Sequence, residues 1–431
     1  MKRTMATALE NRVGERVRVS GWVHHQRHLA QLSFLLVRDA SGIVQIVVEE
    51  ESARAGAAAL QPEAVIEIKG EVVPAPQAPC GVELHRPVIT VLSEPEASPP
   101  FEMRRPELTA SLPTLLDHAA LSLRHPRNRA ALAISAASLT GFRSTLDGLG
   151  FTEIQTPKIV STATESGANV FELDYFGRPA YLAQSPQLYK QIMVGVFERV
   201  YETGPVFRAE PHDTARHLAE YVSLDVEMGF INDHRDVEAV LRDVLAGMVA
   251  GVRTNAEAAV ALLGLALPQV PPVIPRIHFR DAQVMLASAT GEDVVGEPDL
   301  APAHERWLGD WALAEHGSDF LLVEGYPMEK RPFYIHPQPG SPEFSNSFDL
   351  LFRGLELVTG GQRLHRFADY AAVLDDTARA SLDGYLEAFR HGMPPHGGFA
   401  IGLERWTSRL VGASNIREVT LFPRDRGRLI P

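Results

Sequence analysis

Charged side chains lie two residues apart on both sides of a polar loop at 211–216. Arg208 and Glu210 precede this loop, and Asp225 and Glu227 follow it in a run that alternates polar with apolar residues. The β-prone residues before the loop form two runs, 200–203 and 206–210, and we expect Gly204-Pro205 to break the strand between them. Side chains two residues apart point to the same face of a strand, so two strands joined by the loop would carry these charges on one face of a sheet. Burying so many ionisable groups is costly unless a charged ligand pairs with them. The pattern therefore predicts a binding site, although an exposed hairpin with a solvated charged face fits the same residues.

Three further segments carry side chains suited to a charged ligand. Gln187 and Lys190 are one helical turn apart after a Ser-Pro helix start. Glu356 falls in an alternating run that leads into Gly360-Gly361. Arg405 follows a glycine-bracketed strand, near the start of a helix, where a guanidinium can meet a phosphate from a fixed direction.

The elements that must position these residues belong to more than one domain. With 431 residues the chain is too long for a single core, and its 22% charged and 45% hydrophobic residues are typical of soluble globular proteins. We find neither the apolar core of a signal peptide nor a run long enough to span a bilayer, so we expect a cytoplasmic protein without a membrane segment. The net charge of −13 argues against loose nucleic-acid binding but leaves room for a local basic groove. Cys80 is the only cysteine, which excludes an intrachain disulfide and a cysteine-based zinc cluster.

Short β-prone runs fill the first hundred residues and predict a small closed barrel. Gly21-Trp22-Val23, a loop rich in histidine and arginine, and Phe34 on the next strand are typical of an oligonucleotide-binding barrel, in which an exposed aromatic ring stacks on a base. A phenylalanine such as Phe34, taken alone, is more often a core residue than a stacking platform. The runs are 16–23, 32–39, 43–48, 64–73 and 88–92.

A proline-rich linker at 95–106 separates this barrel from a second region of helices and strands. The apolar spacing predicts helices over 128–148 and 233–263. Between them we expect a strand over 150–157 that Pro157 ends. Residues 268–345 are rich in proline, and we interpret them as an irregular insertion to which we assign no chemistry. Within it we expect a helix at 304–315 and a strand at 320–323. The overall fold class is therefore α+β.

Three motifs in order resemble those of the class II aminoacyl-tRNA synthetases. The matching segments are Gly150–Pro157, then Phe207–Glu210 with Arg216–Tyr221, and finally Gly402–Arg405. With the segment Gln184–Gln191 between the first two motifs, the chain resembles the aspartyl-tRNA synthetases of the compact archaeal type over nearly its whole length. No phosphate loop and no dinucleotide fingerprint supports a competing nucleotide fold.

The resemblance implies a domain plan and a homodimer. Residues 1–104 would form an anticodon-binding OB-fold, 105–128 a hinge, and 129–431 a class II catalytic domain with a mainly antiparallel sheet flanked by helices, interrupted by the insertion at 268–345. In this family the first motif builds the dimer interface, which would place Pro157 near the two-fold axis.

The resemblance also implies an ATP-dependent reaction, in which the α-carboxylate of L-aspartate attacks the α-phosphorus and the resulting aspartyl-adenylate is transferred to tRNA(Asp). By their motif positions, Arg208 would hold the α-phosphate, Arg405 the γ-phosphate and Tyr221 the adenine, while Glu210 would bind adenine or orient the acceptor end of the tRNA. Arg208, Glu210 and Arg405 are the implied catalytic residues. The implied ATP-binding residues are Arg208, Glu210, Arg216, His217, Leu218, Tyr221, Glu356, Gly402, Leu403, Glu404 and Arg405.

A Mg²⁺ ion bound with ATP needs only one or two protein oxygens beside those of the phosphates. Glu356 is the implied ligand, with Thr359 where the family often has serine, and Asp349 is a further candidate. Arg363 would hold the side-chain carboxylate of aspartate with help from Lys190. The implied aspartate-binding residues are Glu165, Gln187, Lys190, Asp225, Thr359 and Arg363.

Asparaginyl-tRNA synthetases share these motifs, but usually lack the lysine at the position of Lys190, which favours aspartate. In the barrel, the resemblance places His24, Phe34, Gln45 and Pro79 on the anticodon. Strict archaeal relatives have tryptophan and lysine where this chain has His24 and Pro79, so we predict that tRNA(Asn) is charged as well and that a tRNA-dependent amidotransferase converts the product. The open alternatives are an asparaginyl enzyme, a strictly discriminating aspartyl enzyme, an asparagine-making paralogue and a catalytically silent RNA-binding relative.

Overall fold

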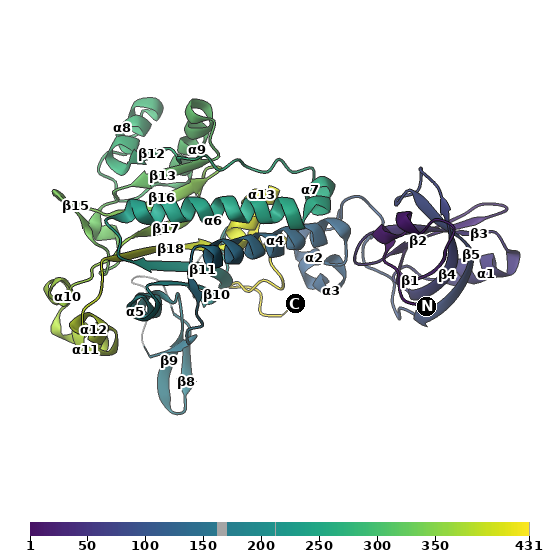
Figure 1. Ribbon diagram of the computed structural model, residues 1–431, viewed down its shortest axis with the longest axis horizontal. Coiled ribbons are helices and arrows are strands. Elements are labelled where there is room, and N and C mark those ends of the chain that lie inside the picture. The colour runs from purple at the N-terminus through teal and green to yellow at the C-terminus, as the bar shows by residue number, and fades with distance from the viewer. Residues whose placement is uncertain (162–169, 212, 431) are drawn as a thin grey trace. The chain divides into compact units, whose positions relative to one another are not determined.

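The computed structural model describes residues 1–161, 170–211 and 213–430. The chain divides into two compact units, Met1–His125 and Pro126–Pro431 (Figure 1). The division falls inside the predicted hinge at 105–128. Because Glu165 lies outside the described residues, the structure gives no place for this predicted aspartate contact.

The first unit contains the predicted barrel, which closes in the strand order β1-β2-β3-β5-β4. Alternate residues such as Val17, Val19, Leu35 and Val37 fill its interior, as the period of two predicts. One helix between β3 and β4 was not predicted. The bounds are β1 Arg16–His28, β2 Ser33–Arg38, β3 Ile43–Val48, α1 Glu51–Ala59, β4 Val65–Pro74 and β5 Val82–Ser93, with short 3-10 helices at Ala6–Ala8 and Glu10–Arg12 and helices α2 Leu112–Asp117 and α3 Ala119–Ser122 after the barrel.

The second unit is built on an eight-stranded sheet in the order β12-β13-β16-β17-β18-β11-β10-β6. All neighbouring strands in it are antiparallel except β12 with β13 and β10 with β6. The bounds are β6 Thr152–Glu153, β10 Arg199–Phe207, β11 Glu220–Gly229, β12 Arg276–His278, β13 Phe320–Glu324, β16 Ser347–Phe352, β17 Leu355–Gln362 and β18 His396–Gly402.

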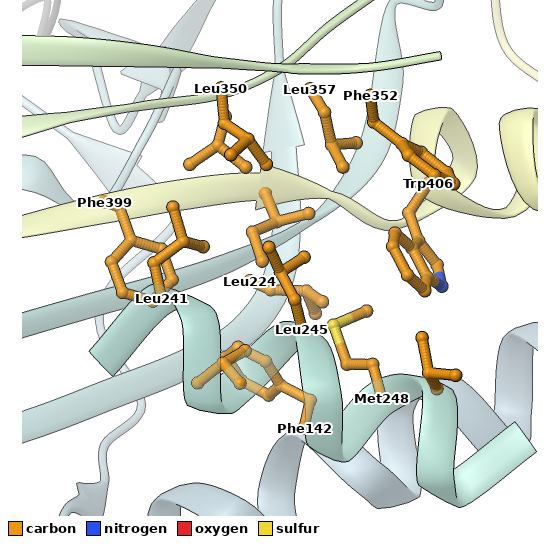
Figure 2. Close-up of a cluster of buried hydrophobic side chains, with 14 of the residues drawn as sticks. Phe142, Leu224, Leu241, Leu245, Met248, Leu350, Phe352, Leu357, Phe399 and Trp406 are labelled. Carbon is orange, nitrogen blue, oxygen red and sulfur yellow. The ribbon is translucent and has the colours of Figure 1, made fainter. Parts of the chain in front are cut away.

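Two long helices, α4 (Pro126–Gly148) and α6 (His234–Asn255), run side by side across one face of this sheet (Figure 1). Gly141 and Gly247 allow the close approach, because a Cβ atom on Gly141 would lie 2.2 Å from the carbonyl oxygen of Gly247. The apolar core between the helices and the sheet is shown in Figure 2. Its labelled side chains are Phe142, Leu224, Leu241, Leu245, Met248, Leu350, Phe352, Leu357, Phe399 and Trp406.

The remaining elements of the second unit lie at the margins of the sheet or carry residues of the site. A three-stranded sheet, β7-β9-β8, and a two-stranded one, β14-β15, stand apart from the main sheet. The bounds are β7 Ile159–Val160, β8 Glu172–Tyr175, β9 Arg178–Leu182, α5 Gln187–Phe197, α7 Glu257–Leu263, α8 Phe279–Thr290, α9 Pro302–His316, β14 Pro337–Gln338, β15 Ser341–Ser345, α10 Phe367–Val373, α11 Asp376–Ser381, α12 Asp383–Arg390 and α13 Leu403–Val411, with 3-10 helices at Met328–Lys330 and Ile416–Val419.

Two expectations about strands were wrong. Gly204-Pro205 does not break the first strand of the charged hairpin, because β10 continues through it to Phe207. A proline is tolerated there since β6 pairs only with Val200 and Tyr201, which leaves that side of β10 without a strand further along the described residues. The segment 150–157 forms a strand only at Thr152–Glu153.

The region 268–345 is more regular than its prolines suggested. The expected helix and strand are confirmed as α9 and β13, but α8 and β12 were missed. Through β12 and β13 this region extends the main sheet and has its own small core around Phe279, Leu286 and Leu308. It therefore forms one edge of the sheet instead of an irregular loop.

Candidate active site

A cavity of about 320 Å³ opens on the face of the sheet that lacks α4 and α6. It brings together Arg208, Glu356, Arg363 and Arg405, which lie on four different segments. Apart from Leu403 and the undescribed Glu165, every residue implied for ATP or aspartate lines it. These are Gln187, Lys190, Arg208, Glu210, Arg216, His217, Leu218, Tyr221, Asp225, Glu356, Thr359, Arg363, Gly402, Glu404 and Arg405.

Strand β11 shows how the sequence separates the cavity from the core. Leu224 and Val226 belong to the apolar core, whereas Ser223 and Asp225 line the cavity and Glu227 is buried on their side. The predicted alternation is therefore confirmed, and the exposed-hairpin interpretation is wrong, because Asp225 and Glu227 are 2% and 0% exposed.

The floor of the cavity holds two cations and two carboxylates that are almost completely buried. Lys190 Nζ lies 3.0 Å from Asp225 Oδ1 and 3.4 Å from Glu227 Oε2, and Arg363 Nε donates to Glu227 Oε1 at 3.0 Å. Burial alone would raise the pKa of Glu227, but the charges of Arg363 and Lys190 outweigh it and hold this pKa below its usual value. Glu227 is therefore held as a carboxylate between the two cations, and it is a member of this array that the family motifs did not include.

Gly398 makes this array possible. A Cβ atom there would lie 2.0 Å from the carbonyl oxygen of Val226 and 2.2 Å from Glu227 Oε2, so a larger residue would clash with the main chain of β11. Arg363 Nη2 donates to the Gly398 carbonyl oxygen at 3.0 Å. The glycine-bracketed strand in the sequence thus marks the place where β18 pairs closely with β11 beside the floor.

A buried polar network lies behind the array. Gln187 Nε2 donates to Gln191 Oε1 at 3.1 Å, and Gln191 Nε2 lies 3.0 Å from His396 Nε2. Tyr385 also donates to Gln191 Oε1, at 3.1 Å. Burial lowers the pKa of His396 to about 4, so this ring is neutral near pH 7. Sequence reasoning missed His396, because only the fold brings it beside α5.

The other end of the cavity carries oxygen ligands and arginines. The Thr359 hydroxyl donates to Glu356 Oε1 at 3.4 Å, and Arg405 Nη1 donates to the Glu356 carbonyl oxygen at 3.0 Å. Asp349 pairs with Thr359 in the strand register and lies 3.1 Å from Arg331. Carboxylate and hydroxyl oxygens are the donors that Mg²⁺ prefers, so Glu356 and Thr359, which both line the cavity, fit a bound magnesium ion.

Asp349 differs from the other two in its ionisation. Its burial, helped by the Glu356 carboxylate, raises its pKa to about 6, although Arg331 opposes this shift. Asp349 is 4% exposed, and it does not itself line the cavity, whereas Arg331 does. Arg331 therefore stands between Asp349 and the cavity.

The loop after β10 and the start of α13 contribute further charged side chains to the cavity. Arg208 lies over the Tyr221 ring, 5.8 Å from its centroid, and His217 Nε2 lies 3.7 Å from Glu210. Arg216 lies 3.7 Å from Glu305, which also accepts a hydrogen bond from the backbone N–H of Glu356.

Glu305 and Arg331 come from the region 268–345, to which the sequence analysis assigned no chemistry. The structure places Arg331 in the cavity lining and Glu305 against Arg216. Neither lies in a recognised motif, and both contacts join different elements of the fold, so spacing along the sequence gave no signal.

Two residues of the third motif, Leu403 and Glu404, hold the start of α13 in place. Leu403 is buried in the apolar core and does not line the cavity. The Glu404 carboxylate accepts the backbone N–H of Val222 at 3.1 Å, and burial raises its pKa to about 7. Both residues fix the start of α13, which carries Arg405.

In the barrel, the residues implied to contact the anticodon differ in how far they are exposed. Phe34 and Gln45 share the outer face, where Phe34 is half-buried and Gln45 donates to Glu83 at 2.6 Å. Pro79 is exposed in the turn before β5. His24 is 9% exposed at a bulge in β1, and its Nδ1 lies 3.2 Å from Arg38 Nη1. Burial, with the charge of Arg38, lowers the pKa of His24 to about 4.

Residues 111–426 match the family model described as tRNA synthetases class II (D, K and N), and residues 17–92 match that of the OB-fold nucleic acid binding domain. The chain belongs to the class II tRNA synthetases. The predicted α+β fold, an OB barrel followed by a class II catalytic unit, is thereby confirmed.

The relatives of this class II synthetase match it from end to end. The aspartate–tRNA(Asp/Asn) ligase of Deinococcus radiodurans is 46% identical, with 100% of this chain and 99% of the relative covered. That of Thermus thermophilus is 45% identical, with 100% of both covered. Among solved structures, asparaginyl-tRNA synthetase from Pyrococcus horikoshii, complexed with asparaginyl-adenylate, is similar with a TM-score of 0.92, 29% identity and 100% of both chains covered.

Within the described residues, every helix is too short or too polar to cross a bilayer.

Proposed function

We propose that the protein attaches L-aspartate to tRNA(Asp), with ATP as the energy source and aspartyl-adenylate as the intermediate, and that it also charges tRNA(Asn). The observation that carries the proposal is the convergence of a buried Lys190–Arg363 pair with Arg208, Arg405 and Glu356 in one cavity. The names of the relatives from Deinococcus radiodurans and Thermus thermophilus support the same reaction and both tRNAs.

The floor of the cavity matches the charges of aspartate. Its Asp225 carboxylate would receive the α-ammonium group, with Gln187 nearby, while Arg363 and Lys190 would receive the side-chain carboxylate. Because Glu227 already pairs with both cations, they are held in place before the ligand arrives. A preformed ionic site avoids part of the cost of ordering side chains on binding.

Activation requires positive charge where the phosphate oxygens gain negative charge in the transition state. Arg208 would contact the α-phosphate and Arg405 the γ-phosphate, with Arg216 and His217 near the phosphate tail and Tyr221 on the adenine. Glu210 would orient the adenine or the acceptor end. Glu356 and Thr359, with Asp349 behind them, would hold a Mg²⁺ ion, which when bound neutralises charge on the ATP phosphates.

The proposal that both tRNAs are charged rests on residues of the barrel. Phe34 and Gln45 share a face suited to stacking on a base and reading its edge. At the positions where strict relatives have tryptophan and lysine, this chain has His24, which is buried, and Pro79, which offers no cation. A weaker reading of the third anticodon base would follow, and a tRNA-dependent amidotransferase would then convert Asp-tRNA(Asn).

Asparagine is the second candidate substrate, because a solved asparaginyl enzyme has a very similar fold. A neutral amide, however, would leave part of the charge of Lys190 and Arg363 uncompensated in a buried site, which is costly. We therefore favour aspartate. We also propose a cytoplasmic homodimer, with the exposed Pro157 near its axis, for which sedimentation should give twice the 47.3 kDa of one chain.

The test is ATP–pyrophosphate exchange by the full-length protein with aspartate or asparagine, followed by charging of purified tRNA(Asp) and tRNA(Asn). We expect exchange with aspartate only and charging of both tRNAs. Exchange with asparagine alone would overturn the substrate, and no exchange with either would favour a silent RNA-binding relative. Charging of tRNA(Asp) alone would overturn the proposals that tRNA(Asn) is a substrate and that an amidotransferase acts on the product. It would leave the proposed aspartate reaction unaffected.

A further inference from the structure

Three ionisable side chains converge on the helix-covered face of the sheet, away from the active-site cavity. His234 and Glu238 lie one turn apart at the start of α6, and Glu324 ends β13. Glu324 pairs in register with Phe348, and the His234 ring stacks on Phe348 with a centroid distance of 6.4 Å. Side chains of paired residues lie on the same face of a sheet, so Glu324 points toward α6. We call His234, Glu238 and Glu324 the α6 triad.

The triad holds buried polar atoms that have no hydrogen-bond partner in the described structure. His234 and Glu238 are 7% and 4% exposed, and both ring nitrogens of His234 and both carboxylate oxygens of Glu238 are unpartnered. One possible ligand atom from each of the three residues lies within 4.8 Å of the others. Leaving several such atoms unsatisfied in one place costs free energy, so the arrangement points to a missing partner.

Two arginines face the triad but do not satisfy it. Arg276 lies 3.5 Å from an oxygen of Glu238 and 3.5 Å from one of Glu324, and Arg235 lies 3.8 Å from Glu324. Their side chains are 37% and 59% exposed, so both can turn toward solvent. Neither arginine makes a hydrogen bond to Glu238, since both oxygens of Glu238 and Oε1 of Glu324 remain without a hydrogen-bond partner.

We propose that the α6 triad binds a zinc ion, with one imidazole nitrogen and two carboxylate oxygens as its ligands. His234 Nε2 lies 3.8 Å from an oxygen of Glu238 and 3.8 Å from one of Glu324, so a small closing movement would bring all three atoms to bonding distance of one ion. A nitrogen and two oxygens suit Zn²⁺, and a solvent molecule would complete four ligands. Such an ion would tie the start of α6 to the sheet edge formed by β12 and β13.

Zinc binding to the full-length protein tests this proposal. After treatment with a chelator and removal of the chelator, the protein is titrated with ZnCl₂ without ATP, and bound zinc is measured by equilibrium dialysis. His234→Gln and Glu324→Gln should each weaken binding at least about tenfold, because each removes one of three ligands. Glu356→Gln, the matched control in the active-site cavity, should retain this binding. Zinc should also raise the thermal midpoint of the wild type by a few degrees, and that of the triad variants by less.

Arg276→Gln separates the zinc site from a simple ion-pair cluster. Removing a competing cation should strengthen zinc binding about tenfold if the triad binds the metal, since both act on the same carboxylates. The proposal is overturned if the wild type and Arg276→Gln bind no zinc, or if Glu356→Gln abolishes all of it. Because Glu324→Gln is nearly isosteric, it keeps the test decisive even if His234→Gln does not fold. Neither result bears on aspartate activation, which has its own assay.

Discussion

The two faces of the eight-stranded sheet use the same strands for opposite purposes. On the α4–α6 face, Leu224 and Val226 of β11 join a core of close-packed apolar side chains (Figure 2). On the other face, Asp225 and Glu227 of the same strand hold Lys190 and Arg363 in a charged cavity. The comparison teaches that apolar packing and ionic contacts to the cavity are separated here by one residue along the chain, so neighbouring substitutions should differ in their effect on activity.

Lys190→Leu should have the largest effect and would test the role of the charged face in both stability and activity. It leaves Asp225 and Glu227 without one of their cations, so we expect unfolding in urea to show a loss of about 3–5 kcal/mol. Exchange with aspartate should fall about a thousandfold or more, because a cation in the proposed pocket is gone. Lys69→Leu, at a lysine on the barrel that is 51% exposed, is the control and should change neither quantity much. Unchanged exchange in Lys190→Leu would show that the pocket is wrongly assigned.

Trp406→Ala tests the apolar face. Trp406 is fully buried, stacks on Phe352 at 5.2 Å and donates to Ser138 Oγ at 2.9 Å. We expect a loss of about 3–5 kcal/mol in the free energy of unfolding, as for other buried aromatic residues. The fraction that remains folded should keep its exchange activity within a few fold. A loss of activity without a loss of stability would contradict the separation of the two faces.

Arg405→Gln, one residue away from Trp406, should lower activity and leave stability nearly unchanged. Its side chain is 27% exposed and its ion pair with Glu356 is 3.7 Å long, so stability should change by less than about 1 kcal/mol. Exchange should fall about a hundredfold or more, because a charge on the proposed γ-phosphate site is removed. Steady-state measurements at varied ATP concentration would check this, and a purely structural role of Arg405 would predict the opposite pattern.

Glu404→Gln tests how the ionisation of a buried carboxyl group makes the stability of the protein depend on pH. The folded-state pKa of about 7 exceeds the ordinary value of 4.5, so the folded protein binds a proton that the unfolded chain does not between these values. The contribution of Glu404 to stability is therefore greatest below pH 4.5 and is lost as the pH rises through 7. Relative to Glu404→Gln, the wild type should lose on the order of 2 kcal/mol between pH 5 and 8 in urea unfolding. Parallel curves for the two proteins would rule out this titration.

Thr359 should give the smallest effect. Thr359→Ser keeps the hydroxyl beside Glu356, so exchange at varied Mg²⁺ should stay within about threefold of the wild type. Thr359→Val keeps the shape but removes the oxygen, and the Mg²⁺ concentration for half-maximal activity should rise. Equal behaviour of the two variants would exclude Thr359 from the metal site.

The sequence predicted the parts of the site that depend on local spacing. Alternation placed Asp225 correctly on a face opposite Leu224, and the helix period placed Gln187 and Lys190 together. The three motifs predicted which distant segments converge. Each of these signals is carried by a few neighbouring residues.

The rest depends on contacts that spacing does not encode. Arg331 and Glu305 act from a region whose prolines predicted irregular chain, and His396 meets α5 only through the fold. The break predicted at Gly204-Pro205 failed because a proline is tolerated on a strand side that lacks a hydrogen-bonding neighbour. Local sequence propensity therefore gave a wrong prediction at Gly204-Pro205, because the position of the strand in the sheet decides whether a proline is tolerated.

The pairing of β18 with β11 at Gly398 has a consequence for altering amino-acid choice. There is no room at Gly398 for even a methyl group, which would lie 2.0 Å from the Val226 carbonyl oxygen and 2.2 Å from Glu227 Oε2. Laboratory selection for another substrate would therefore have to work through other positions, such as those of α5, because a side chain at Gly398 would displace Glu227 from the ionic array.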